Sequence, residues 1–439
     1  MSAGGMVNGF DPARTGSLPD RTRTVVERRA RALGPAYRLF YSEPVQFARG
    51  EGVYLYDLDG NAYLDAYNNV PSVGHCHPHV VAAVATQAAT LNTHTRYASE
   101  PLVSYAERLL ATLPDALDKV MFTCSGSEAV DLALRVAAAA TGHTGIIVTA
   151  NAYHGTTARS AEISPSLGPG VPLGAHVRTV APPPSDATDP GAAFGSAVAA
   201  AAADLQRHGF GVSCLIVDTI LASDGVIPDP AGFLEPAAAA VRRAGGLVVA
   251  DEVQPGFGRT GSTFWGFERH GLTPDLAVTG KPMGNGQPIA AMMARDEVLA
   301  PFATAARYFN TFGGNSVSIA AADAVLDVLR DEDLPGNARD VGAHLASGLR
   351  QLGDDRIRAV RGAGLYLGVE LAGADGAPGT ALAQAVVDGM RQRRILISST
   401  GSDGACLKIR PPLPFTRGHA DRLVEELATV LATIPPGAV

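Results

Sequence analysis

The sequence is poor in cysteine and has no long hydrophobic run. Its four cysteines lie far apart without CxxC spacing, and two of them fall in apolar stretches typical of buried strands. Such cysteines predict a reduced, cytoplasmic protein rather than a disulfide framework. The first residues lack the apolar segment of a signal peptide, and no uncharged apolar stretch reaches the roughly 18 residues of a membrane span. We therefore expect neither export nor membrane insertion.

Charge is also scarce in this chain. Charged residues make up 18% of it, and the formal net charge is −8. Nucleic-acid binding requires a basic patch, but the densest basic stretch, residues 21–31, includes Glu27 and has the pattern of a helix face. We expect no nucleic-acid partner. The hydrophobic fraction of 46% is ample for the buried core of a globular enzyme.

The length of 439 residues is too great for one ordinary core, so we predict a large domain and a smaller one. Residues 1–20 are small and polar and are predicted to be a flexible tail. Residues 22–33 have helical spacing and stop at Gly34-Pro35. Asp59-Gly60 lies between alternating apolar residues and predicts a tight antiparallel hairpin.

Short apolar runs alternate with helical stretches from about residue 80 onward. This alternation indicates an α/β fold, in which βα units form a mostly parallel sheet covered on both faces. The runs are 120–123, 145–149, 214–217, 247–250 and 276–279. After residue 336 the pattern is typical of an α+β terminal domain, with strands near 357–360, 365–371 and 407–410 and helices near 381–392 and 421–434.

Polar residues follow several of these runs, where ligands of parallel sheets bind. Ser125, Gly126 and Ser127 follow the run 120–123 and open a predicted helix. Glycine lets the backbone approach an anion, hydroxyls donate hydrogen bonds to it, and the first N–H groups of a helix favour negative charge. The segment has the composition of a phosphate site. An ordinary serine N-cap is the alternative.

Two further runs end in an aromatic residue and a carboxylate. Tyr153 and His154 follow the run 145–149, and Asp251 ends the run 247–250. Tyr153 is suited to stack on a planar ring, although a tyrosine of the core or of an interface is the alternative. Asp251 is either a functional acid or a strand-end cap.

Lys281 directly follows the run 276–279 and is flanked by Gly280 and Pro282. Lysine with a lowered pKa forms Schiff bases, because the neutral amine attacks a carbonyl. A phosphate site, a stacking aromatic, an acid for a ring nitrogen and a lysine nucleophile at one sheet edge together indicate pyridoxal phosphate.

A GxGxxG pattern at Gly256, Gly258 and Gly261 is the main competing signal, because it occurs in dinucleotide-binding folds. The residues that follow, 262–271, are aromatic and turn-like instead of forming a long helix. We therefore do not predict NAD binding.

From about Tyr37 to its end the sequence resembles the class III aminotransferases, which are pyridoxal-phosphate enzymes of fold type I. The most specific matching segments are Asp251-Glu252-Val253-Gln254 with Gly256-Phe257-Gly258-Arg259, and the run from Gly280 to Gly286. The resemblance implies a seven-stranded, mostly parallel sheet in a large domain, residues 76–335. It also implies a smaller α+β domain built from residues 21–75 and 336–439.

The resemblance also implies roles for individual residues. Lys281 would form the aldimine and move protons, Asp251 would pair with the pyridine nitrogen, and Gln254 would reach the ring's 3-oxygen. The remaining cofactor contacts would come from Ser125, Gly126, Ser127, Tyr153 and His154.

A homodimer with shared active sites is implied as well. Thr311 matches the threonine that family members lend to the phosphate of the neighbouring subunit.

The implied reaction is transfer of an amino group between an amine or amino acid and a 2-oxo acid through a pyridoxamine intermediate. Arg410 matches the family arginine that receives the substrate carboxylate, for which guanidinium geometry is suited. A structural ion pair is the alternative for Arg410. Tyr67 and Ser223 complete the predicted substrate site. Ser223 stands where the ornithine and 4-aminobutyrate branches have a glutamate that neutralises this arginine, and Asp224 is the candidate to replace it.

Elimination is the alternative reaction, because residues 68–70 and 74–78 look closer to a subgroup that includes phospho-lyases acting on amino-alcohol phosphates. A basic cluster for a substrate phosphate would favour it, but none is evident in the sequence. No metal site is predicted, and His75-Cys76-His77 is not read as one, since the family uses no metal there.

Overall fold

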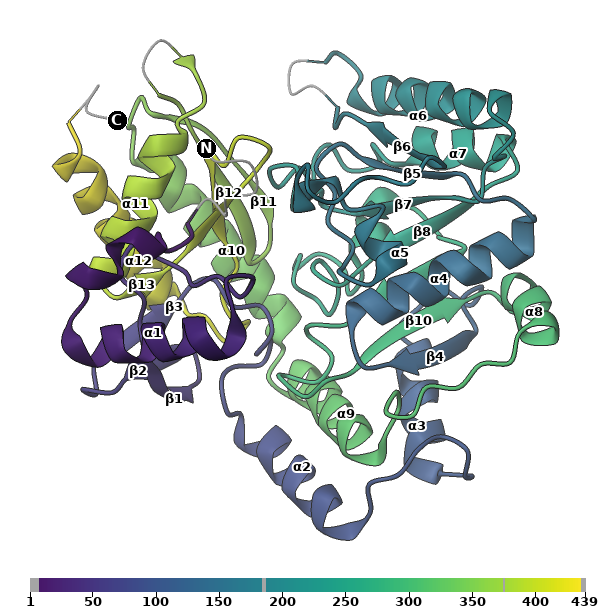
Figure 1. The fold of residues 1–439 in the computed structure, drawn as a ribbon, viewed down its shortest axis with the longest axis horizontal. Helices are drawn as coiled ribbons and strands as arrows, with labels where there is room; N and C mark the ends of the chain where they lie inside the picture. The colour runs from purple at the N-terminus through teal and green to yellow at the C-terminus, as the bar shows by residue number, and fades with distance from the viewer. Residues whose placement is uncertain (1–7, 184–186, 374–375, 436–439) are drawn as a thin grey trace.

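A seven-stranded sheet forms the middle of the large lobe of the protein, whose computed structural model describes residues 8–183, 187–373 and 376–435 (Figure 1). The strand order is β4-β10-β9-β8-β7-β5-β6. Strand β10 runs antiparallel to both of its neighbours, and the other neighbouring strands are parallel. The strands are β4 (Lys119–Thr123), β5 (Ile146–Thr149), β6 (Val177–Val180), β7 (Cys214–Asp218), β8 (Leu247–Asp251), β9 (Leu276–Thr279) and β10 (Ala290–Ala294).

Alternate residues of the central strands face two different layers. Cys214 and Ile216 pack with helix α4 (Gly126–Thr141), whereas Leu215 and Val217 pack with α6 (Pro190–Arg207) and α7 (Glu235–Arg243). Because both faces are buried, both sets of positions are apolar, and the strand sequences are continuous hydrophobic runs. The predicted α/β class is confirmed, and all five predicted runs are strands of this sheet.

The two ends of the chain meet in the smaller lobe, as predicted (Figure 1). One sheet has the order β1-β2-β3-β13, in which β13, from the C-terminal segment, pairs in parallel with β3. The other has the order β11-β12-β15-β14. The strands are β1 (Phe47–Glu51), β2 (Tyr54–Asp57), β3 (Ala62–Asp65), β11 (Ile357–Ala363), β12 (Tyr366–Leu371), β13 (Ile395–Leu396), β14 (Ser398–Thr400) and β15 (Cys406–Ile409).

The predicted hairpin joins β2 and β3, which pair antiparallel. The Asp57 carboxylate accepts hydrogen bonds from the backbone N–H groups of Asp59 and Asn61, at 3.0 and 2.9 Å, and Gly60 has a φ of 82°. These features close the turn in the way the sequence predicts. The helices of this lobe are α1 (Asp20–Leu33), α10 (Leu334–Gln351), α11 (Thr380–Gln392) and α12 (Arg417–Thr433).

A short 3-10 helix, η1 (Pro12–Ser17), lies within the segment predicted as a flexible tail. Asp11 caps it by accepting a hydrogen bond from Ala13 N–H at 2.9 Å, and Pro12 starts it. The prediction for residues 1–20 did not include this helix. The domain boundaries at 75/76 and 335/336 stay predictions.

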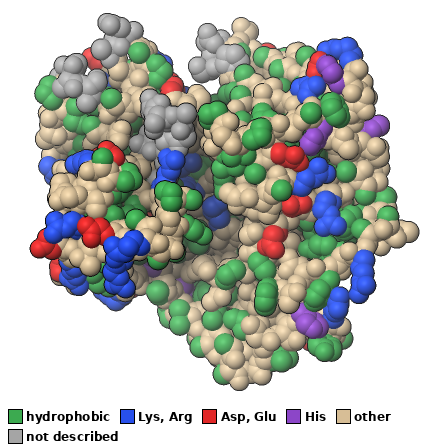
Figure 2. Space-filling model, viewed as in Figure 1, with side chains coloured by type: hydrophobic (Ala, Val, Ile, Leu, Met, Phe, Trp, Pro, Cys, Tyr) green, Lys and Arg blue, Asp and Glu red, His purple; other side chains and the backbone are tan. Residues whose placement is uncertain are grey.

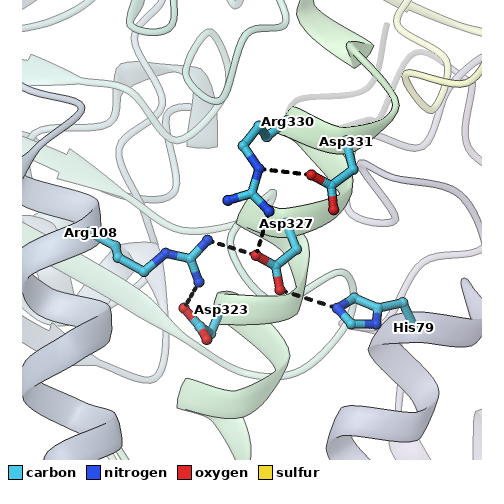
Figure 3. A network of polar contacts seen from close by, with 6 residues as sticks. All are labelled: His79, Arg108, Asp323, Asp327, Arg330 and Asp331. Carbon is cyan, nitrogen blue, oxygen red and sulfur yellow. Dashed lines mark hydrogen bonds and ion pairs between the residues drawn. The ribbon is translucent and has the colours of Figure 1, made fainter.

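Helices α2 (Pro78–Thr90) and α3 (Glu100–Leu110) pack against α9 (Ser316–Asp331) beside the large sheet. A network of charged side chains joins the three helices (Figure 3). Arg108 of α3 binds Asp323 and Asp327 of α9, the latter at 2.8 Å, and His79 of α2 lies 3.2 Å from Asp327. Helix α8 (Asp296–Ala305), which precedes α9 in the chain, packs on α4.

The glycines of the GxGxxG pattern form a turn that packs against α10. Gly258 and Gly261 have φ values of 74° and 75°, in the left-handed region that favours glycine. A Cβ at Gly261 would lie 2.5 Å from the backbone of Arg339. The spacing therefore reflects close packing of a turn on α10.

Candidate active site

A cavity lies where the carboxyl ends of β4, β5, β7, β8 and β9 meet at one edge of the large sheet. Figure 2 shows a groove between the two lobes, with Lys and Arg side chains visible inside it. Seven of the residues that line the cavity were predicted as cofactor contacts. The lining residues are Gly126, Ser127, Tyr153, His154, Gly155, Asp218, Asp251, Val253, Gln254 and Lys281.

The start of α4 forms the phosphate end of the cavity. Gly126 and Ser127 occupy the first turn of this helix, where backbone N–H groups have no intrahelical acceptor and attract anions. A Cβ at Gly155 would lie 2.5 Å from Ser127 Oγ, so the opposite wall needs a glycine. Ser125 acts as the N-cap, because its Oγ accepts from Glu128 N–H at 3.3 Å. It is not among the residues that line the cavity.

A buried acid and a buried histidine lie at the floor of the cavity. His154 Nδ1 is 2.7 Å from Asp251 Oδ2, and the two residues are 4% and 5% exposed. Asp251 Oδ1 also accepts from Val253 N–H at 3.1 Å. A buried carboxylate held in this way is suited to receive a ring N–H. His154 Nε2 has no hydrogen-bond partner among the described residues.

Lys281 follows β9 and reaches the same cavity. Burial lowers the pKa of its amine, and the positive charge of Arg410 lowers it further, while Asp251 and Asp218 oppose the shift. A lower pKa increases the fraction of neutral amine, which is the form that attacks a carbonyl.

Asp218 lines the cavity but was not among the predicted site residues. Burial, with a contribution from the charge of Asp251, raises its pKa to about 7. Its two carboxylate oxygens accept from the backbone N–H groups of Ile220 and Ala222, at 3.0 and 3.2 Å. The available signal was its position, because Asp218 ends β7 and pairs in register with Asp251 of β8. Gly155 and Val253 were also missed.

Arg410 follows β15 and faces the cavity residues from the small lobe. Its Nη1 donates to Gln254 Oε1 at 2.6 Å and to Asn69 Oδ1 at 2.7 Å, and its guanidinium carbon lies 4.5 Å from the ring centre of Tyr67. Tyr366 donates to the same oxygen of Gln254 at 3.0 Å. No carboxylate forms an ion pair with Arg410 within the described ranges, so the structural ion pair considered for it is not observed.

The structure does not bring Ser223, Asp224 or Thr311 into the cavity lining. The Asp224 carboxylate accepts from Thr149 Oγ1 at 2.6 Å and from Asn151 N–H at 2.9 Å, so it is turned toward the end of β5 instead of toward Arg410. The backbone oxygen of Ser223 accepts from Asn151 Nδ2 at 2.6 Å. Thr311 lies exposed on the surface.

His75 and His77 have separate partners. His75 Nε2 lies 2.7 Å from Asp65 Oδ2, and His77 Nε2 lies 2.9 Å from Glu332 Oε1. Throughout the part of the chain that the structure describes, no three or more His, Cys, Asp or Glu side chains gather in the manner of a metal site.

The fold and this cavity define a pyridoxal-phosphate enzyme of fold type I. The phosphate end, the buried acid and the buried amine suit the phosphate, the ring nitrogen and the aldehyde of that cofactor. The chain belongs to the class III aminotransferase family, whose model matches residues 40–431, and its cofactor is pyridoxal phosphate.

Relatives of two named activities match nearly the whole chain. An alanine–glyoxylate aminotransferase 2-like protein of Drosophila melanogaster is 39% identical, over 92% of this chain and 86% of its own. An ethanolamine-phosphate phospho-lyase homolog of Caenorhabditis elegans is 35% identical, over 98% of both chains. The solved structure of an Arthrobacter phospholyase in complex with phosphoethanolamine is 42% identical, with a TM-score of 0.91, over 94% of this chain and 100% of that one.

An ornithine aminotransferase from Toxoplasma gondii shares the fold, with 25% identity, a TM-score of 0.81 and coverage of 96% and 97%. None of the helices in the described ranges is both long and apolar enough to cross a membrane.

Proposed function

We propose that this enzyme transfers an amino group between an amine or amino acid and a 2-oxo acid, with Lys281 as its central residue. The observation that carries the proposal is the convergence of Lys281, Asp251 and the first turn of α4 on one cavity, with Arg410 facing it from the small lobe. When bound, pyridoxal phosphate supplies an electrophile for the substrate amine and an electron sink for the adjacent carbon.

Each residue has a role that follows from its position. The N–H groups of Gly126 and Ser127 hold the cofactor's phosphate. Asp251, oriented by His154, keeps the ring nitrogen protonated. The Lys281 amine would bind the cofactor's aldehyde and, when free, would take the proton from the substrate Cα as a general base. Tyr153, which lines the cavity, would stack on the ring.

Arg410 binds the anionic group of the substrate in this proposal. To do so it exchanges its present hydrogen bonds to Gln254 and Asn69 for bonds to that group. Tyr67, which lies against the guanidinium, supports it from one side. Gln254 is then free to reach the cofactor's 3-oxygen.

A cytoplasmic homodimer completes the proposal. Exposed apolar side chains gather in two segments, with Tyr97 66% exposed in one and Phe312 69% exposed in the other, beside Thr311. His94 stacks on Tyr97 and also contacts the ring of Phe309, so the two segments form one patch. Such a patch supports contact with a second copy, into whose phosphate site Thr311 would reach.

Mixing two inactive variants tests this arrangement. In a dimer of Lys281→Ala with Thr311→Ala, the site on the Thr311→Ala chain has its own Lys281 and receives Thr311 from its partner. We expect mixed dimers to regain part of the activity. If Thr311 served its own chain, neither site would be complete and activity would stay absent.

Elimination from an amino-alcohol phosphate is the second candidate, favoured by the likeness to the Arthrobacter phospholyase. Here the same Cα–H bond breaks and its proton passes to Lys281. The electron pair expels phosphate as the neighbouring C–O bond breaks, and water then releases an aldehyde and ammonia. The two reactions use the same cofactor contacts. Transamination passes the amino group to the cofactor, whereas elimination expels phosphate from the substrate.

Absorbance of the holoenzyme between 300 and 500 nm separates the candidates, after an amine is added without any 2-oxo acid. Conversion to a stable band of the aminated cofactor establishes transamination. A band that returns unchanged while phosphate and ammonia accumulate establishes elimination. Absence of a cofactor band after reconstitution would contradict the role of Lys281.

A further inference from the structure

Lysine is rare in this chain, and the few lysines differ in burial and in ion pairing. Only three of the 35 Lys and Arg residues are lysines: Lys119, Lys281 and Lys408. Lys119 is half-buried, with its side chain 41% exposed, and forms an ion pair with Asp118 at 2.7 Å. Lys408 is only 9% exposed. A chain that uses arginine at nearly every other cationic position keeps a compact ammonium at this buried one, which indicates that the position has a chemical requirement.

Strand β15 directs Lys408 toward the large lobe. Leu407 and Ile409 belong to the main core, so the alternate residues Cys406 and Lys408, with Arg410 beyond the strand end, lie on the opposite side. Cys406 Sγ lies 3.5 Å from the backbone oxygen of Gly225, and Arg410 bonds Gln254.

Gly225 and Gln254 belong to the loops that follow β7 and β8. Lys408 stands between Cys406 and Arg410 in the sequence, and these two residues contact those loops. It therefore faces the ends of the strands that finish in Asp218 and Asp251, two residues of the cofactor cavity.

The Lys408 ammonium has no counterion in the described part of the chain, because no hydrogen bond or ion pair to it is formed there. The residues opposite it in the sheet are Gly368 and Ser398, which carry no charge. Asp218 uses both of its oxygens for backbone N–H groups. A buried, unpaired ammonium costs free energy, so folding alone does not explain it.

Arg410 also has no carboxylate partner among the described residues, because it donates its hydrogen bonds to two neutral side-chain oxygens. Two buried cations from one strand edge thus face the site, with no carboxylate paired to either among the described residues.

We propose that Lys408 and Arg410 together form the substrate's anion subsite and that this pair selects a phosphate monoester over a carboxylate. The inference rests on elimination, the second candidate under the proposed function, and assigns the residues that recognise the phosphate of its substrate. A phosphate monoester has a charge of about −1.5 to −2 at neutral pH, which matches two cations. Arginine binds two of its oxygens, and lysine adds a point charge. That charge also stabilises the phosphate as its bond to carbon breaks.

Ligand binding to the holoenzyme tests the pair, since the cofactor's own phosphate then occupies the site at α4. Inorganic phosphate, O-phosphoethanolamine and ethanolamine are titrated against wild type, Lys408→Met and the matched control Lys119→Met. Calorimetry and the shift of the cofactor absorbance give the affinities. We expect Lys408→Met to weaken both phosphate ligands by roughly 10- to 100-fold, the loss typical of a charged hydrogen bond. Ethanolamine affinity should change less than about twofold, and Lys119→Met should match wild type.

Equal weakening of ethanolamine and O-phosphoethanolamine would overturn the proposal, and so would unchanged phosphate binding. If Lys408→Met fails to fold with cofactor, Lys408→Gln provides the same comparison at nearly the native length. Failure of the elimination reaction itself shows differently, because wild type would then release no phosphate from O-phosphoethanolamine, whatever the change in its cofactor band.

Discussion

His154 Nδ1 lies 2.7 Å from Asp251 Oδ2, and both side chains are buried. The histidine comes from the loop after β5 and the acid from the end of β8, with β7 between these strands in the sheet. The contact therefore links the ends of β5 and β8, which are two strands apart in the sheet, and holds the Asp251 carboxylate in place. It orients the acid that we assign to the ring nitrogen.

Replacing His154 should weaken this acid without unfolding the protein. His154→Ala removes a hydrogen bond to a charged group, which contributes about 1.5–3 kcal/mol. We expect roughly tenfold or greater loss of cofactor affinity and slower removal of the substrate Cα proton. Retained cofactor absorbance after dialysis and the rate of the amine half-reaction measure the two effects. His208→Ala, at an exposed histidine, is the control, and equal cofactor retention in both variants would show that His154 does not support Asp251.

Arg259 should be needed to dock the small lobe beside the site. Its buried Nη1 donates to the backbone oxygens of Leu365 and Pro411, at 3.0 and 2.7 Å, and Pro411 directly follows Arg410. Arg259→Met leaves buried carbonyl groups without a donor, so we expect the free energy of unfolding to fall by about 1–3 kcal/mol. We also expect a higher KM for the anionic substrate. Urea denaturation and steady-state kinetics are the measurements, with exposed Arg243→Met as control. An unchanged KM would show that Arg259 does not position Arg410 for substrate binding.

The network of Figure 3 should contribute little by comparison. Asp327 binds Arg108, His79 and Arg330, but its side chain is 29% exposed, and solvent screens such pairs. Asp327→Ala should lower the free energy of unfolding by no more than about 1 kcal/mol, and added salt should reduce the difference from wild type. The cofactor spectrum should not change. A loss several times larger would mean that the network holds α2 and α3 in place.

Residues that directly follow strands could be predicted from the sequence because the chain itself fixes their position. Once the runs 247–250 and 276–279 are strands of one parallel sheet, Asp251 and Lys281 must emerge at the same edge. The same reasoning placed Gly126 and Tyr153. None of these positions depends on the details of side-chain packing.

Two strands of the large sheet and several contacts could not be found in this way. Strand β10 is made of alanine and methionine, which favour helices, and it is a strand because sheet neighbours flank it and α4 packs on its face. Strand β6 is a short edge strand with exposed and half-buried residues in its middle. Each owes its conformation to tertiary contacts that local sequence does not encode.

Side-chain direction was the other limit. Arg410 and Gln254 are 156 positions apart in the chain, and their bond depends on how the small lobe docks. Asp224 was the candidate partner for that arginine, yet Thr149 and Asn151 bind its carboxylate. Which partner a polar side chain bonds depends on how distant segments pack together, and neighbouring residues in the sequence do not determine that packing.

Substrate affinity should depend on pH if Lys408 binds the phosphate. Burial, and then the charge of Arg410, lower the pKa of the Lys408 amine to about 7, and Asp218, Cys406 and Lys281 are the other titratable groups around it. The amine is protonated below this pH and neutral above it, while a phosphate monoester gains its second charge near pH 6. Affinity for O-phosphoethanolamine should therefore be greatest between about pH 6 and 7 and should fall as pH rises further. Lys408→Arg keeps its charge at high pH, so the fall on the alkaline side should disappear, whereas Lys119→Met should retain the wild-type profile. An alkaline fall of the same size in Lys408→Arg would place the titrating group elsewhere.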